Sequence, residues 1–179
     1  MSKLNVQFRR KREKKTDYRQ RLKLLLSNRP RLVVRKSLKR ITAQIVEYTP
    51  DGDKVVAGVN SKALIKLGWN QNTGNTPAAY LTGLMLGKKA KKKGVSDAIL
   101  DLGFKSSTKG SRVYATLKGV IDAGIKIPVK EDILPDDKRI SGEHIIKYAA
   151  QNKNNFTKAR PEQLKQAFEK VKKEIEKNG

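Results

Sequence analysis

Three consecutive segments decide the fold: RLVVRKS at residues 31–37, ITAQIVEYT at residues 41–49 and KVVAGVNS at residues 54–61. All three are rich in β-branched residues, and each is shorter than an average helix. The sequence PDGD at residues 50–53 separates the second segment from the third and has the composition of a tight turn. These segments therefore predict an antiparallel meander.

Beyond the meander, the pattern alternates between helix and strand. Pro77 suits the first turn of a helix, and the apolar residues after it continue to the lysine-rich run at residues 88–93. Residues 96–102 (SDAILDL) predict a strand, and residues 112–123 predict a second helix. A strand, a helix and a strand in series form a right-handed parallel crossover. We therefore expect an α/β domain whose mixed sheet combines the meander with one parallel crossover strand and is packed with helices.

This core domain is expected at residues 28–128. The residues before it, 1–27, predict a basic arm and a short helix. Residues 8–15 (FRRKREKK) have almost nothing to bury, so we expect them to be extended or disordered in the free protein. Thr16 is the expected N-cap of the short helix, on which Leu22, Leu25 and Leu26 form an apolar stripe.

The residues after the core domain, 129–179, predict a helical extension. Two helical stretches are expected, at about residues 141–151 and 161–177. Their apolar residues are too sparse to support an independent core. We therefore expect this part of the chain to be an appendage.

The charge of the chain points to a polyanionic partner. Lysine and arginine number 41 against 17 aspartates and glutamates, which leaves a net charge of +24 on 179 residues. Residues 1–40 hold 16 of these cations and two acids, a net +14. A basic surface of this strength favours binding to nucleic acid, because the partner neutralises the charge and counterions are released.

Other classes of function are disfavoured by composition. The chain has no cysteine and one histidine, His144, which excludes cysteine-based and multi-histidine metal sites. No apolar run reaches the length of a membrane span. A nuclease would need clustered carboxylates to hold two metal ions. The first strand instead carries arginines at the positions where a carboxylate metal ligand would be needed. We therefore expect no enzyme activity, cofactor, metal, membrane or small-molecule substrate.

Several longer sequence motifs resemble those of one protein family. These strings occur in the family's order over residues 8–148: KTDYRQRLKLLLS with PRLVVRKS, TGNTPAAYLTG, TKGSRVYATLKGVIDAG followed by IP, and SGEHI. They resemble the archaeal and eukaryotic branch of the L-eighteen family of large-subunit ribosomal proteins, whose members bind 5S rRNA.

The resemblance implies a compact α/β domain related in topology to the ribonuclease H-like group. It also implies a structural protein of the large ribosomal subunit, in the cytoplasm, that helps to attach 5S rRNA to the large-subunit rRNA in the central protuberance. The expected partners are 5S rRNA, the neighbouring 23S-type rRNA and the other 5S-associated ribosomal protein. The alternative is a generic basic nucleic-acid-binding protein outside the ribosome.

The candidate rRNA-binding residues form two groups, the first around the arm and the first strand. The arm carries flexible cationic side chains, which can insert between the phosphates of an RNA backbone. Side chains alternate along a strand, so Arg31 and Arg35 share one face and are expected to clamp phosphates there, although a solvent-facing surface is the alternative. Tyr18 either stacks on a base or covers the core. This group comprises Arg9, Arg10, Lys11, Arg12, Lys14, Lys15, Tyr18, Arg19, Arg21, Arg31, Arg35 and, beyond the strand, Arg40.

The second group lies in two loops that precede helices. The sequence TGNTP offers hydroxyl and amide donors at a helix start, where free NH groups can bind a phosphate, although capping is an equally good interpretation. The sequence STKGSR places two cations beside a glycine, but it does not match a P-loop. This group comprises Thr73, Asn75, Lys109, Ser111 and Arg112.

Overall fold

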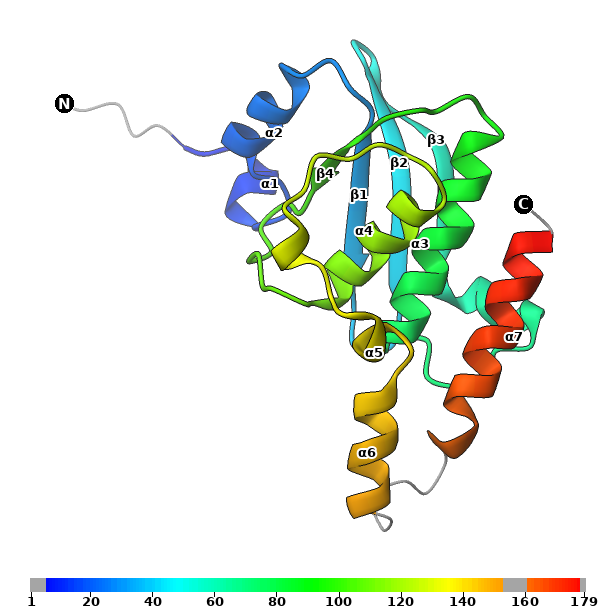
Figure 1. Ribbon diagram of the computed structural model, residues 1–179. Helices are drawn as coiled ribbons and strands as arrows, with labels where there is room; N and C mark the ends of the chain where they lie inside the picture. The colour runs from blue at the N-terminus through cyan, green and yellow to red at the C-terminus, as the bar shows by residue number, and fades with distance from the viewer. Residues whose placement is uncertain (1–5, 153–160, 178–179) are drawn as a thin grey trace.

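The computed structural model describes residues 6–152 and 161–177, and it confirms the mixed α/β sheet (Figure 1). The strands are β1 (Arg31–Lys36), β2 (Ile41–Thr49), β3 (Gly52–Asn60) and β4 (Ile99–Asp101), in the order β3-β2-β1-β4. β1 pairs antiparallel with β2, β2 pairs antiparallel with β3, and β1 pairs parallel with β4. The expected meander and the expected crossover strand are therefore both present.

Two helices lie side by side on one face of the sheet (Figure 1). A 3-10 helix, η1 (Ser61–Leu67), ends at Gly68 in a left-handed conformation and leads to α3 (Thr76–Lys91). Pro77 stands in the first turn of α3, as predicted. α4 (Arg112–Asp122) follows β4 and packs on α3 and β1.

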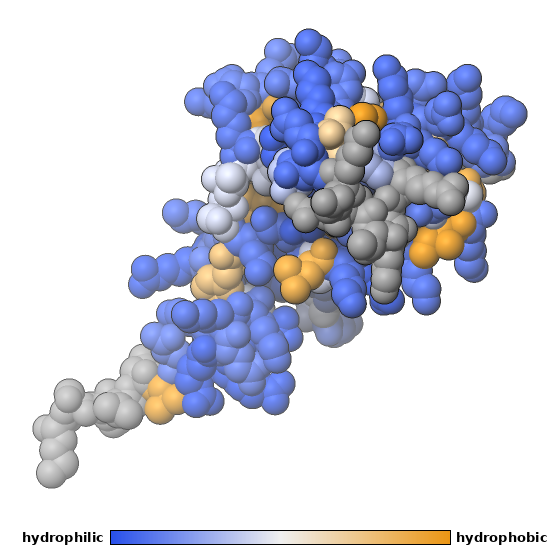
Figure 2. All heavy atoms as spheres, turned by 90° about the horizontal axis from the view of Figure 1, so that it is seen from below, coloured by the Kyte–Doolittle hydropathy of each residue, from blue (hydrophilic) through white to orange (hydrophobic). Residues whose placement is uncertain are grey.

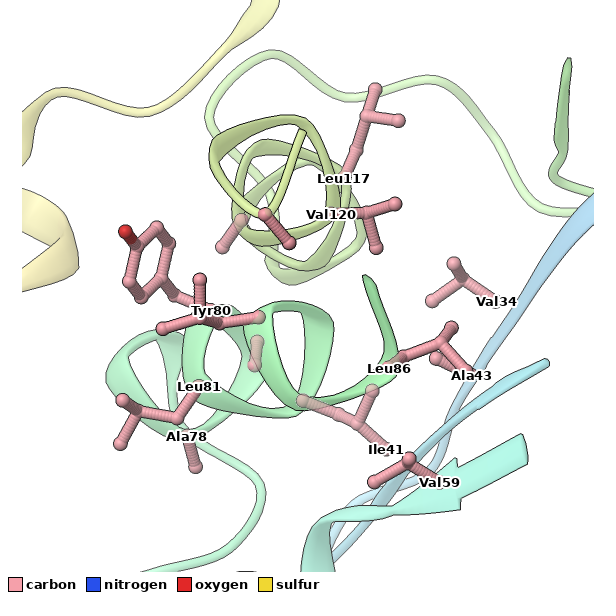
Figure 3. Close-up of a cluster of buried hydrophobic side chains, with 14 of the residues drawn as sticks. Val34, Ile41, Ala43, Val59, Ala78, Tyr80, Leu81, Leu86, Leu117 and Val120 are labelled. Atoms are coloured by element: carbon pink, nitrogen blue, oxygen red, sulfur yellow. The ribbon is translucent and has the colours of Figure 1, made fainter. Parts of the chain in front are cut away.

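The hydrophobic core lies between the sheet and these helices. Leu32 and Val34 of β1 point toward the helices and are almost fully buried, whereas Val33 between them is only half-buried. Figure 3 shows how the core is shared: side chains of the sheet meet side chains of α3 and α4. The labelled residues are Val34, Ile41, Ala43, Val59, Ala78, Tyr80, Leu81, Leu86, Leu117 and Val120.

α3 and α4 approach each other closely because both carry glycines at the contact. A Cβ atom on Gly83 would lie 2.0 Å from the carbonyl oxygen of Thr116, and one on Gly119 would lie 2.2 Å from that of Tyr80. Neither position has room for a side chain, so the two backbones are in direct contact.

The C-terminal part packs against this domain. After η2 (Glu131–Ile133) come α5 (Asp137–Ile140), α6 (Glu143–Gln151), η4 (Pro161–Gln163) and α7 (Leu164–Lys177). α7 contacts α3, and its apolar side chains belong to the same core as those of the sheet. Its sparse apolar residues form one stripe that completes the core of the domain. The buried residues of α7 are Leu164, Phe168, Val171 and Ile175.

The N-terminal arm differs from its prediction in two respects. Residues 8–15 are not extended, because α1 (Arg9–Arg12) forms one helical turn. The N-cap of α2 (Tyr18–Leu25) is Asp17, whose carboxylate accepts hydrogen bonds from the NH groups of Arg19 and Gln20. Thr16 instead accepts a hydrogen bond from Arg10 at 2.9 Å.

The apolar stripe predicted on α2 is not buried. Leu22 is 62% exposed and Leu26 is 74% exposed, and none of the eight described residues of α2 counts as buried. Leu25, the third residue of the stripe, is half-buried, so burial of leucines contributes little to holding this helix in place. No helix in residues 6–152 or 161–177 is long and apolar enough to cross a membrane.

Candidate nucleic-acid interface

The cations of the arm are displayed on the surface. Arg9, Arg10 and Arg12 are exposed, and Glu13 is the single acid among residues 8–15. Glu13 pairs with Lys15 at 2.7 Å and approaches Arg9 at 3.7 Å. Ion pairs this exposed contribute little to stability, so the arm stays strongly basic. Figure 2, a view from below, shows a surface that is hydrophilic over most of its area.

Tyr18 packs against an aromatic ring of the arm. Its ring centroid lies 5.4 Å from that of Phe8, and the two planes are inclined by 53°. Tyr18 is 37% exposed and Phe8 is 72% exposed, so this pair lies outside the hydrophobic core. Of the two interpretations of Tyr18, covering the core is therefore wrong, and an exposed aromatic pair remains available for stacking.

Arg21 attaches the arm to the sheet. Its guanidinium donates two hydrogen bonds, both 2.8 Å long, to the carboxylate of Asp53 on β3. This bidentate pair joins α2 to the meander, and bidentate geometry is the strongest arrangement of these two groups. Arg21 is therefore engaged within the protein, in contrast to Arg19, whose side chain makes no ion pair with any described residue.

Arg31 is buried, which corrects the expectation of an exposed phosphate clamp. Its side chain is 3% exposed, and its Nη1 donates to Asp101 Oδ2 at 3.0 Å. Its Nη2 lies 2.7 Å from Asp53 Oδ2. Arg35 does share a face with Arg31, as alternation predicts, but it is 44% exposed and donates to the backbone oxygen of Asp101 at 3.0 Å.

Two carboxylates thus organise three arginines into one alternating network, in the order Arg21, Asp53, Arg31, Asp101, Arg35. Burial alone raises the pKa of Asp53, but the hydrogen bonds from Arg21 and the adjacent positive charge of Arg31 outweigh it and bring the pKa below its ordinary value of 3.8. Asp53 is consequently ionised at neutral pH.

The second candidate group is assembled at the end of β1, around the β1–β2 turn. Arg112 donates to the backbone oxygen of Gly74 at 2.6 Å and to that of Ser37 at 3.3 Å. Thr73 donates to the backbone oxygen of Lys39 at 2.7 Å. The TGNTP and STKGSR loops, which were predicted separately, therefore both contact the β1–β2 turn, where Arg40 is exposed.

The helix starts in this group differ in their capping. Asn75 caps α3 by accepting a hydrogen bond from the NH of Ala78 at 2.9 Å, so the capping interpretation is right for this residue. Ser111 is the N-cap residue of α4 but makes no side-chain capping bond. Lys109 is exposed beside it. The start of α4 thus combines a positive helix end with an exposed cation.

Several contributors were not singled out in the sequence. Asp53 and Asp101 neutralise predicted RNA ligands, and their partners are far away in the chain, so no local signal identifies them. Phe8 pairs with Tyr18 although the residues that follow it in the chain are charged. Arg139 lies near Gly110, whose added Cβ would be 3.9 Å from the Arg139 Nε. Each of these contacts exists only after folding.

Metal chemistry finds no support in the described part of the chain. Within residues 6–152 and 161–177, no group of three or more histidines, aspartates or glutamates is placed to hold a metal ion. Asp53 and Asp101 are both paired with arginines.

A family model identifies this architecture. The model described as "Ribosomal large subunit proteins 60S L5, and 50S L18" matches residues 2–98 and 89–130. The matched region contains the arm, the whole sheet and both helices that cover it. It spans well over half of the chain. The chain belongs to this family of structural proteins of the large ribosomal subunit.

Proposed function

We propose that this ribosomal protein binds 5S rRNA and helps to attach it to the large-subunit rRNA in the central protuberance. The observation that carries the proposal is the arm, where exposed cations outnumber acids on a segment that contributes no buried residue to the core. Such a segment gains its stabilisation from a polyanion outside the protein. The resemblance to members that bind 5S rRNA supports the choice of this RNA.

The proposed contacts are a revised form of the sequence prediction. The arm contributes its exposed cations and the Tyr18 ring, and the end of β1 contributes Arg40, Lys109 and the start of α4. Arg31 is left out as an exposed phosphate clamp, because its guanidinium is buried between carboxylates. Asn75 is assigned to capping.

Further partners follow from the same assignment. The neighbouring 23S-type rRNA and the other 5S-associated ribosomal protein would lie against surfaces that 5S rRNA leaves uncovered, in the cytoplasmic ribosome. A generic basic protein acting outside the ribosome is the alternative from charge alone, and membership of the ribosomal family speaks against it.

A competition titration tests the proposal. Full-length protein is titrated with labelled 5S rRNA over a series of salt concentrations, with a structured RNA of equal length as competitor. We expect selective binding of 5S rRNA at physiological salt and a steep fall of affinity with rising salt, because many counterions are released. Equal affinity for both RNAs at physiological salt would instead indicate a nonspecific polycation.

A further inference from the structure

A pocket of about 300 Å³ lies between the arm and the outer face of the sheet, opposite α3 and α4. Arg10 and Gln20 line it from the arm side, and Val33, Gln44 and Val55 line it from the sheet side. Its volume is at the lower end of the range for small-molecule sites. The pocket has room for one nucleotide and excludes a double helix.

The floor of the pocket is apolar. Val33, Val46 and Val55 come from three neighbouring strands. Val46 is directly opposite both Arg31 of β1 and Val55 of β3, which places these side chains in one row across the sheet. Val55 is 50% exposed although it is apolar. Val46 is buried, so the accessible apolar surface comes mainly from Val33 and Val55, and such a surface suits the face of a nucleobase.

Two amides border this floor without partners of their own. The side chains of Gln20 and Gln44 both line the pocket, and neither makes a hydrogen bond to any residue in the described part of the chain. Gln44 is opposite Gly58, where the missing side chain leaves space beside it. An amide offers both a donor and an acceptor, which is what the edge of a base requires.

The charge of the pocket favours a phosphate. Five cations line it, namely Arg10, Lys15, Arg21, Arg31 and Arg35, together with three aspartates. The aspartates are already engaged: Asp17 caps α2, and Asp53 and Asp101 pair with the arginines. The balance of five cations and three acids is +2, or +1 when Glu13, which pairs with Lys15, is included, and either value is enough for one phosphodiester.

Arg31 gives an independent indication that a ligand belongs here. Its side chain is only 3% exposed, and its Nε has no hydrogen-bond partner among the described residues. Its Nη2 is close to Asp53 but not aligned as a hydrogen bond. A buried donor without a partner costs free energy, which a phosphate or base oxygen in the pocket would recover.

We infer that this pocket binds a single unpaired nucleotide of 5S rRNA, with its base on the valine floor and its phosphate at Arg10 and Lys15. The inference rests on the proposed function and adds a specific site to it. Proteins read RNA sequence mainly through unpaired bases that are turned out of the helix, and a pocket walled by an arm and a sheet accepts such a base.

Filling the pocket tests the inference without changing any charge. Val55→Trp places a large ring on the floor at a half-exposed position, and Ile65→Trp is the matched control, because Ile65 is 53% exposed and does not line the pocket. We expect Val55→Trp to weaken 5S rRNA binding at least about fivefold, the effect of losing one stacked base. The slope of log affinity against log salt should become shallower by at most about one unit, the contribution of one phosphate, and Ile65→Trp should bind like the wild type.

A second variant and a second readout keep the test decisive. Gln44→Ala leaves the volume open and removes one amide, for which we expect a loss of about two- to tenfold. Chemical probing of 5S rRNA should show one unpaired base that the wild type protects and Val55→Trp leaves reactive. Circular dichroism confirms that each variant is folded.

The outcomes separate the two claims. If the wild type binds 5S rRNA selectively but Val55→Trp and Gln44→Ala bind equally well with the same protected bases, the pocket is not a nucleotide site and the proposed function stands. If the wild type shows no selectivity for 5S rRNA, the proposed function fails and this inference fails with it.

Discussion

A buried guanidinium is stable when carboxylates surround it, and Arg31 has two of them. Asp53 reaches it from β3 and Asp101 from β4, so the start of β1 is tied to the adjacent strand β4 and, across β2, to β3. Removing one partner of a buried pair is costly, because the other charge stays buried. Arg31 is therefore important for folding as well as for the pocket.

The first prediction concerns Asp53, the carboxylate shared by Arg21 and Arg31. Asp53→Asn should lower the free energy of unfolding at pH 7 by about 1.5–3 kcal/mol, the range for hydrogen bonds to a charged group. Asp51→Asn is the control, because Asp51 is exposed in the same turn. Chemical denaturation of both variants measures the difference.

The pH dependence of this effect has a definite sign. The arginines hold the pKa of Asp53 below 3.8, so its ionised form stabilises the folded state above that pH. The stabilisation is lost as the pH falls through the lower pKa of the folded state. The gap in stability between wild type and Asp53→Asn should therefore narrow below about pH 4. A gap that is the same at pH 7 and pH 3 would contradict the assigned role.

Residue environments could be predicted from the sequence only where they depend on local geometry. Alternation correctly placed Arg31 and Arg35 on one face. It could not predict that one is buried, because the burial comes from an arm and two aspartates that are distant in sequence. The N-cap was misplaced by one residue, since Thr16 and Asp17 are both good caps and tertiary contacts decide between them.

At the scale of elements, the contact between α3 and α4 depends on the absence of side chains. Gly119→Ala would place a Cβ 2.2 Å from the carbonyl oxygen of Tyr80, a backbone atom that cannot turn aside. We expect the variant to lose about 1–3 kcal/mol or more of stability, the usual cost of overpacking. Thermal unfolding followed by circular dichroism measures this loss.

Gly58→Ala is the control for this prediction. Its added Cβ would meet its nearest neighbour, the Cγ of Gln44, at an ordinary 3.5 Å. Unfolding temperatures that drop equally in both variants would mean that the α3–α4 contact can relax, contrary to this account.

Element types were largely predictable, because the strands and the helices of the core have clear periodicity. The helical turn in the arm was missed because α1 is too short to have a periodic signal, and its Phe8–Tyr18 contact depends on α2.

At the scale of the whole molecule, the buried apolar side chains and the basic N-terminal arm lie in different parts of the chain. The core takes its side chains from the sheet, α3, α4 and α7, whereas α1 and α2 contain no buried residue within their described ranges. The division of the chain at residues 27 and 128 remains a prediction. α7 nevertheless shares the core, because its stripe of four apolar residues meets α3.

The last prediction uses this separation. Deleting residues 1–15 removes seven cations and one acid, a net +6, and removes no buried side chain of the described residues. The unfolding temperature should scarcely change. The affinity for 5S rRNA should fall, and the slope of log affinity against log salt should become shallower by at most about five units, since each neutralised phosphate contributes somewhat less than one.

The control for this deletion removes a similar charge from the other end of the chain. Changing the exposed lysines Lys147, Lys165, Lys170, Lys173 and Lys177 to glutamine removes +5 from α6 and α7. If the arm is a specific RNA ligand, this variant should change the salt slope much less than the deletion does. Equal changes in both variants would show that the arm acts only through total charge, because a nonspecific polyanion attraction does not depend on where the cations are.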